Sequence, residues 1–110
     1  MAISPIRFKL RDSFKLKDKG YINYIFNKGS KKLQKSSIIF YAESDRFKFL
    51  ISFKKRLLNS ARRNKLKRQI KEFIRLNQYN LKKIDCAILI ARHPSSKRQL
   101  SNELEFLLIK

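Results

Sequence analysis

The chain has 110 residues, a length typical of one domain, and its 28 Lys and Arg against 8 Asp and Glu give a net charge of +20. Because 43% of the residues are apolar, including nine Phe and four Tyr, the composition favours one folded core over disorder. The longest apolar run, residues 86–91, is too short to span a bilayer, and charges near the N-terminus interrupt the apolar stretch that a secretion signal needs. A positive excess of this size usually serves nucleic acid or an anionic membrane, and nucleic acid is the leading partner.

Alternating apolar and basic residues at the N-terminus predict a short extended arm over residues 1–14. Helical spacing begins at Ile22 and continues to Phe26. Asp18 precedes this segment as a good N-cap, and Gly29 follows it at a typical C-cap position. The sequence therefore predicts a first helix between these two residues.

Three candidate strands follow the first helix. Residues 30–35 are basic and irregular, which suits a short edge strand whose lysines discourage pairing with another chain. Residues 37–43 (SIIFYAE) are rich in β-formers, and residues 46–53 alternate strictly between apolar and other side chains. Because only Ser44 and Asp45 separate the last two runs, we expect a tight hairpin between them.

Residues 59–75 (NSARRNKLKRQIKEFIR) read as a basic amphipathic helix with Ser60 as its N-cap. Its apolar stripe comprises Leu66, Ile70, Phe73 and Ile74, with Asn77 at the polar end. The polar residues that border or oppose this stripe are Arg62, Arg63, Asn64, Lys65, Lys67, Arg68, Lys71 and Arg75. Cations in the first turn oppose the helix dipole, which makes sense if a polyanion completes this half of the helix. The alternative is a solvated basic face.

Residues 84–91 (IDCAILIA) are apolar at nearly every position, which predicts a central strand covered on both faces. Cys86 lies inside this run and is predicted to be a small core residue in a reducing cytoplasm. Pro94 ends the strand, and a last helix follows with Ser96 or Ser101 as its N-cap. The order α-β-β-β-α-β-α predicts one α+β sandwich over residues 1–110, with helices packed on a small mixed sheet of about four strands.

The residues that carry out catalysis or bind metal in other proteins are sparse here. The eight carboxylates are scattered along the sequence, and Glu72 lies within reach of Arg68 and Arg75 for an ion pair. The lone His93 has no obvious partner, and one Cys with one His excludes a zinc site. With only two glycines there is no phosphate-binding glycine loop. We therefore expect no catalytic and no metal-binding side chains, and interpret the chain as a binding protein.

The segment from Arg63 to Arg68 (RNKLKR), followed by Lys71 and Glu72, resembles the signature helix of the protein subunit of bacterial ribonuclease P. Further landmarks occur in the family's order: Phe26-Asn27-Lys28-Gly29, Ser52 to Arg56, and Ala91-Arg92-His93-Pro94. Leu58 departs from the family's frequent glycine before the helix, and Lys71 replaces an arginine. The likeness spans roughly residues 15–108.

This resemblance implies a protein that helps a catalytic RNA remove the 5′ leader of precursor tRNA, with the RNA and its magnesium ions performing the hydrolysis. It also implies a left-handed β-α-β crossover through the basic helix. The residues implied to face the catalytic RNA are Arg63, Asn64, Lys65, Lys67, Arg68 and Lys71. The basic pattern of the helix adds Arg62 and Arg75 as RNA-binding candidates. The residues implied to line a groove for the single-stranded leader are Tyr21 or Ile22, Phe26, Tyr41, Lys55 and Arg56.

Two rival functions remain open from the sequence. A ribosomal or other structural RNA-binding protein would share the charge but not the ordered landmarks. A protein-only nuclease is disfavoured by the scattered carboxylates. If the resemblance to the ribonuclease P protein holds, we expect a cytoplasmic protein that is monomeric within the ribonuclease P holoenzyme. We expect its own side chains to hold no cofactor.

Overall fold

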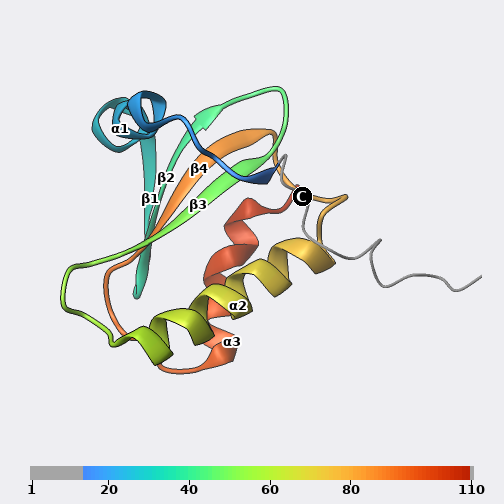
Figure 1. Cartoon of the computed structure of the whole chain (residues 1–110). Helices are drawn as coiled ribbons and strands as arrows, with labels where there is room; N and C mark the ends of the chain where they lie inside the picture. Colours follow the sequence, from blue (N-terminus) through green and yellow to red (C-terminus); the bar gives the residue numbers. More distant parts are fainter. Residues whose placement is uncertain (1–13, 110) are drawn as a thin grey trace, which may run out of the picture.

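The computed structural model describes residues 14–109, so almost all of the predicted arm lies outside the described residues. The elements, in chain order, are α1 (Lys19–Lys28), β1 (Ser30–Leu33), β2 (Ser37–Glu43), β3 (Lys48–Phe53), α2 (Ser60–Leu76), β4 (Ile84–Ile90), α3 (Lys97–Leu104) and a 3₁₀ turn, η3 (Glu105–Leu107). The predicted order and the α+β class are confirmed (Figure 1). None of the helices in this part of the chain combines the length and the apolar character that crossing a membrane requires.

The four strands form one mixed sheet in the order β1-β2-β4-β3. β1 and β2 form an antiparallel hairpin closed by Gln34 N–H donating to the Ser37 carbonyl at 2.9 Å. The predicted hairpin between β2 and β3 is wrong, because β4 lies between these two strands. Ser44 N–H donates instead to the Lys83 carbonyl at 3.0 Å. The short connection between β2 and β3 therefore passes over the start of β4. Turn residues and alternation show where strands end, but not which strand pairs with which.

β4 is the central strand predicted from its apolar run. It pairs antiparallel with β2 and parallel with β3, and six of its seven residues are buried. Because β3 and β4 are parallel neighbours, the chain must cross over between them, and α2 makes that crossover. α2 and α3 lie on one side of the sheet, whereas α1 contacts β2 and β4 from the other (Figure 1).

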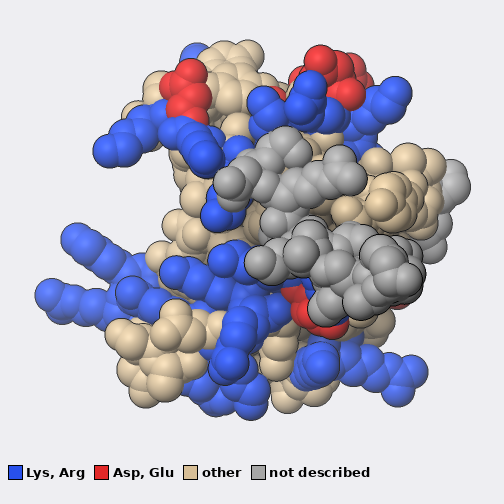
Figure 2. Space-filling model, turned by 45° about the vertical axis from the view of Figure 1, so that its right-hand side comes forward, with Lys and Arg blue, Asp and Glu red and all other residues tan. Residues whose placement is uncertain are grey.

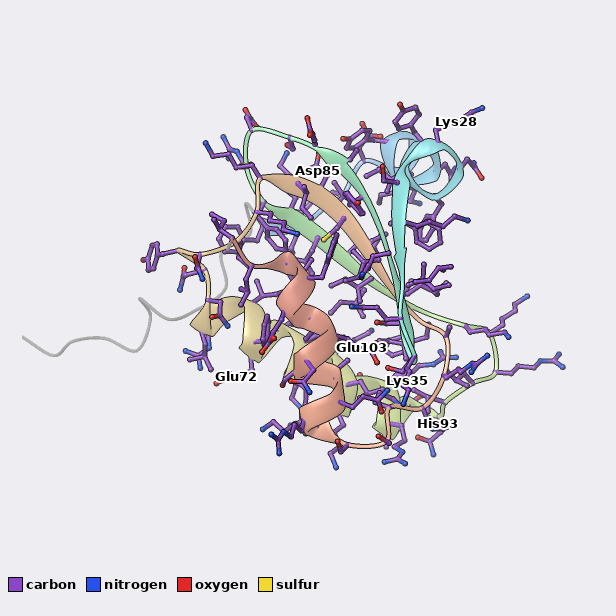
Figure 3. All side chains as sticks on the ribbon, turned by 180° about the vertical axis from the view of Figure 1, so that it is seen from behind. Lys28, Lys35, Glu72, Asp85, His93 and Glu103 are labelled. Atoms are coloured by element: carbon purple, nitrogen blue, oxygen red, sulfur yellow. The ribbon has the colours of Figure 1, made fainter. Side chains whose placement is uncertain are left out.

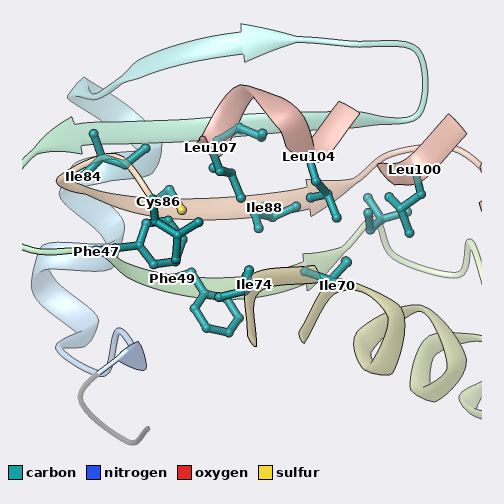
Figure 4. Packing of buried hydrophobic residues seen from close by; sticks show 13 residues of the cluster. Phe47, Phe49, Ile70, Ile74, Ile84, Cys86, Ile88, Leu100, Leu104 and Leu107 are labelled. Carbon is teal, nitrogen blue, oxygen red and sulfur yellow. The ribbon is translucent and has the colours of Figure 1, made fainter. Parts of the chain in front are cut away.

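The core lies between the sheet and the pair α2 and α3 (Figure 4). Ile70 and Ile74 supply the apolar stripe of α2, and Leu100 and Leu104 supply that of α3. These side chains meet a row from β4 that includes the fully buried Cys86. Burial raises the pKa of the Cys86 thiol far above its ordinary value, as expected for a small core residue.

The helix caps were predicted at two of three N-termini. Asp18 accepts from Tyr21 N–H at 3.2 Å, and Ser96 accepts from Gln99 N–H at 3.1 Å, which decides between the two serines considered for α3. Ser60 is not the cap of α2. Asn59 takes that position, and its side chain accepts from Arg62 N–H at 2.9 Å. Both residue types suit an N-cap, so a shift by one position is not visible in the sequence.

A buried carboxylate ties α3 to the turn between β1 and β2 (Figure 3). Glu103 accepts from Ser36 N–H at 3.2 Å and from the Ser37 hydroxyl at 2.6 Å. The Ser36 hydroxyl and the Gln99 amide also donate to it, at 3.0 Å and 2.9 Å. Four donors compensate for the loss of water around this charge, so it fixes the position of α3 on the sheet.

Gly29 ends α1 at a point where two backbone carbonyls approach closely. A Cβ added here would lie 2.6 Å from the Ile25 carbonyl oxygen and 2.8 Å from that of Tyr41. Its φ of −71° is open to any residue, so the close approach, and not the dihedral angle, requires glycine.

We therefore expect Gly29→Ala to destabilise the fold by about 2–3 kcal/mol, because backbone atoms must move to admit the methyl group. Gly20→Ala, in the first turn of α1, is the matched control. The only atom near its added Cβ is Asp18 Oδ1, at an ordinary contact distance of 3.5 Å. That replacement should stabilise the chain by about 0.5–1 kcal/mol, because alanine is the better helix former. Urea unfolding of both variants measures the difference, and equal midpoints would contradict this assignment.

Candidate nucleic-acid interface

The side of α2 that faces away from the core carries a group of uncompensated cations. Arg62, Lys65, Arg68 and Lys71 are exposed, as is Asn64. None of these cations has a carboxylate partner among residues 14–109. Lys and Arg side chains crowd the lower part of Figure 2, where α2 lies, while Asp and Glu show mainly near the top. This surface can neutralise several phosphates at once.

Two further cations lie along the border of α2 that faces β3. The Arg63 guanidinium lies 5.8 Å from the centroid of the Phe53 ring, and Lys67 Nζ lies 6.0 Å from it. Both side chains are half-buried, and Arg63 Nε is buried without a hydrogen-bond partner. They therefore rest against an aromatic ring while their charge adds to the basic surface.

Arg75 differs from the other cations of α2. Its Nε donates to Glu72 Oε1 at 3.1 Å, and a second bond joins the same two side chains. The ion pair predicted for Glu72 is confirmed, with Arg75 as the partner. Because this pair already compensates its charge, Arg75 contributes less to the basic surface than its neighbours.

The opposite face of the sheet holds α1 and three rows of side chains that cross β2, β4 and β3. The register of the strands aligns Ala42, Asp85 and Lys48 in the first row. The second row comprises Phe40, Ala87 and Leu50. The third row comprises Ile38, Leu89 and Ser52. Apart from Asp85 and Ala87, these residues are only half-buried, so α1 leaves part of this face accessible.

Phe26 of α1 and Phe40 of β2 make an aromatic contact on this face of the sheet. Their ring centroids lie 4.9 Å apart, and Lys31 Nζ lies 5.8 Å from the Phe40 ring. Proteins that bind single-stranded nucleic acid combine aromatic rings with lysines, because bases stack on the rings and phosphates are attracted to the cations.

Tyr41, which the sequence assigns to the predicted leader groove, lies on the other face of the sheet. Its ring packs against Phe106 at 5.2 Å between centroids, beside the main core. Successive residues of a strand point to opposite faces, so Tyr41 cannot share a face with its neighbour Phe40. Phe40, and not Tyr41, therefore lies on the face of the sheet that α1 covers.

Tyr21 of α1 lies beside Lys48, a member of the first row on this face of the sheet. It lines a hollow of about 430 Å³ together with Lys17, Arg46 and Lys48. Burial, followed by a hydrogen bond with the Asp85 carboxylate, raises the pKa of Tyr21. One carboxylate oxygen of Asp85 is buried without a partner. Ile22, the alternative to Tyr21, is also half-buried on α1.

Lys55 and Arg56 lie at the far end of the sheet from Tyr21, in the loop after β3, and both are exposed. Arg56 adopts a left-handed φ of 63°, a conformation that costs a non-glycine residue about 1 kcal/mol or more. Leu58, which stands where the family often has glycine, is buried. The loop therefore places its strain at a basic residue and uses the family's glycine position for packing.

Several residues of these surfaces were not singled out from the sequence, among them Phe40, Lys31 and Lys48. The run SIIFYAE is apolar at both alternating positions, so its pattern gives no sign of which face is which. Lys48 joins this surface because the strand order places β3 beside β4, where Lys48 pairs in register with Asp85. No local signal reveals that pairing.

A small α+β sandwich with a basic crossover helix and an aromatic pair beside a lysine on the opposite face has the features of a nucleic-acid-binding protein. The ribonuclease P family model matches residues 10–110. The chain therefore belongs to the ribonuclease P protein family.

Individual relatives agree with this assignment. The ribonuclease P protein component of Staphylococcus aureus (strain JH9) is 30% identical over 105 residues, covering 90% of this chain and 89% of the relative. A solved structure of the Staphylococcus aureus protein matches with a TM-score of 0.74 at 25% identity, over 86% of this chain and 91% of that one. The Thermotoga maritima protein matches with a TM-score of 0.62 at 26% identity, over 83% of this chain and 80% of that one.

The environment of Tyr21 predicts a pH effect. Its pKa is raised above the ordinary 10.0, so above pH 10 the unfolded chain ionises this group before the folded chain does. Stability should consequently fall as the pH rises from 10 through the folded-state pKa, and Tyr21→Phe should remove that part of the loss.

Asp85→Asn should lower the pKa of Tyr21, because it removes the negative charge and weakens the hydrogen bond that the tyrosine hydroxyl donates. Tyr24→Phe removes only the weaker electrostatic effect of the neighbouring tyrosine hydroxyl, so it should change the pKa of Tyr21 less. An NMR titration of the tyrosine Cζ resonances measures both. An unchanged Tyr21 titration in Asp85→Asn would contradict this account.

Proposed function

We propose that this chain is the protein component of ribonuclease P and assists the endonucleolytic removal of the 5′ leader from precursor tRNA, which generates mature tRNA 5′ ends. The observation that carries the proposal is the group of exposed, uncompensated cations on α2, within a chain of the ribonuclease P protein family. The relatives named as ribonuclease P protein components support it.

In this proposal α2 binds the catalytic RNA. Arginine guanidiniums bind phosphates through paired hydrogen bonds, and the lysines add positive charge along the same surface. Asn64 contributes an uncharged donor and acceptor among the cations. Arg63 and Lys67, supported by Phe53, extend this surface toward β3.

The 5′ leader binds, we infer, in the groove on the opposite face of the sheet. Phe26 and Phe40 provide rings for base stacking at about 1–3 kcal/mol per base, and Lys31 and Lys48 provide positive charge. Tyr21 stands at one end of the groove, while Lys55 and Arg56 stand beyond the other end. Stacking accepts any base, which suits a substrate class whose leaders differ in sequence.

The division of labour follows from this arrangement. In our proposal the RNA performs the phosphodiester hydrolysis with magnesium ions, and the protein supplies affinity for both RNAs. No protein side chain holds a metal or cofactor in this scheme. The protein acts as a monomer within the holoenzyme in the cytoplasm.

The proposal is tested by adding the full chain to ribonuclease P RNA and precursor tRNA at a low magnesium concentration. Leader removal should increase, because the cations of α2 reduce the need for magnesium to bring the two RNAs together. If about 6–10 phosphates are neutralised, affinity for the RNA should fall roughly 10³–10⁵-fold between about 50 and 200 mM salt. No increase in leader removal would favour a structural RNA-binding protein, and cleavage without the RNA subunit would favour a nuclease.

Variants separate the α2 surface from a general charge effect. Arg68→Ala should weaken binding of the ribonuclease P RNA several-fold and make it less sensitive to salt. Lys28→Ala removes the same charge at the last turn of α1, an exposed position at the opposite end of the molecule from Glu72 and His93 (Figure 3). Equal losses in the two variants would show that only net charge matters.

The groove is tested by two neighbouring aromatic residues on opposite faces of β2. Phe40→Leu should reduce the preference for precursor over mature tRNA, because it removes a ring that contacts Phe26. Tyr41→Leu, whose ring packs against Phe106 on the other face, should leave that preference unchanged. The ratio of the dissociation constants for the two tRNAs is the measurement, and a larger effect from Tyr41→Leu would contradict the assignment.

A further inference from the structure

A hollow on the border of α2 that faces α3 adjoins the exposed cations of this helix and includes two of them, Arg62 and Lys65. It encloses about 220 Å³ between the first half of α2 and residues 93–97, the segment that leads into α3. Four of the side chains that line it are Arg62, Lys65, His93 and Lys97. His93 marks the end of the molecule where α2 and α3 begin (Figures 1 and 3). Two segments about 30 residues apart thus contribute positive or hydrogen-bonding groups to one concave site.

The hollow contains no carboxylate to balance these groups. Its remaining walls come from apolar side chains, including Leu58 and Pro94, and from uncharged polar ones. Glu103, an acidic residue of α3, is buried among its donors from the turn between β1 and β2. Three permanent cations border the same small space, and an anion bound between them would reduce their mutual repulsion.

The attraction comes from side chains and not from the start of α3. Ser96 already accepts from Gln99 N–H at 3.1 Å, and the Gln99 side chain accepts from Ser95 N–H at 2.7 Å. What remains available is the guanidinium of Arg62, two ammonium groups and an imidazole. Guanidinium and ammonium groups both bind phosphate oxygens.

We propose that this hollow is a binding site, here called the phosphate seat, for one backbone phosphate of the catalytic RNA. The inference rests on the proposed function for the identity of the RNA, whereas the phosphate chemistry rests on the site itself. A volume of about 220 Å³ lies below the roughly 300–1,000 Å³ of pockets for small organic ligands, so it suits a phosphate and not a whole nucleotide. A seated phosphate fixes the position of the RNA along α2, which a convex row of cations does not.

The seat also gives His93 and Lys97 a role in binding. Neither residue belongs to the basic helix, yet both lie against its border. An RNA held here contacts the chain on both sides of the hollow and resists rotation about the α2 axis.

The test compares two adjacent residues of α3 that carry the same charge. Lys97 lines the hollow and Arg98 does not, although both are exposed in the first turn of the helix. With the full chain and ribonuclease P RNA, Lys97→Ala should weaken binding about 3–10-fold and reduce the slope of log affinity against log salt by about 0.7–0.9. Arg98→Ala should change neither quantity by more than a small fraction of that. His93→Ala and Lys97→Gln provide second variants at the same site.

Inorganic phosphate is the second probe, with amide NMR shifts as the measurement. Phosphate should shift the signals of residues 93–97 and of Arg62 in the unmodified chain, and much less in Lys97→Ala. If the RNA binds but Lys97→Ala behaves like Arg98→Ala, the seat is disproved while the proposed function stands. If phosphate shifts these signals and RNA affinity is unaffected by Lys97→Ala, the hollow holds free anions only, which also overturns the inference. Failure of the unmodified chain to bind the RNA at all would instead count against the proposed function.

Discussion

The burial of β4 on both faces is the constraint on which the rest of this structure depends. A strand that is apolar at nearly every position must be covered on each side, and it must be flanked by partners that satisfy its backbone groups. β2 and β3 flank it, the pair α2 and α3 covers one face, and α1 covers part of the other. The basic helix and the aromatic pair Phe26–Phe40 therefore lie on opposite faces of the sheet.

The second determinant is how the few carboxylates are used. Asp18 caps α1, Glu103 joins α3 to the turn between β1 and β2, and Glu72 pairs with Arg75. These acids stabilise the fold locally, so little negative charge is left to compensate the exposed cations of α2. A net charge of +20 disfavours the compact state through self-repulsion, so an anion that binds the folded chain would stabilise it by mass action.

Opposite placement of the two surfaces suits two different forms of RNA. A folded RNA presents phosphates in fixed positions, which match cations held on a rigid helix and, in our proposal, one phosphate held in the hollow between α2 and residues 93–97. A single strand presents bases, which match the Phe26 and Phe40 rings. In our proposal the sheet separates the two surfaces, so the two RNAs bind without competing for the same side chains.

The sequence by itself determined the elements and much of the charge. Capping residues and periodicity located α1 and predicted α3, with its start left open between Ser96 and Ser101. The stripe of α2 defined which of its residues face the core, and spacing placed Glu72 within reach of Arg75 for an ion pair. These features depend on residues within one or two turns of each other, so local rules suffice. The one-residue shift of the α2 cap from Ser60 to Asn59 marks the limit of those rules.

Only the tertiary structure decided which strands are neighbours and which faces are shared. The insertion of β4 between β2 and β3 replaced the expected hairpin, and the packing of Tyr41 against Phe106 left Phe40 in the groove. Both outcomes arise from contacts between segments far apart in the chain, and residues 37–43 are apolar on both faces. The hollow that brings His93 to Arg62 has the same origin, because it exists only once α2 and α3 pack on one side of the sheet.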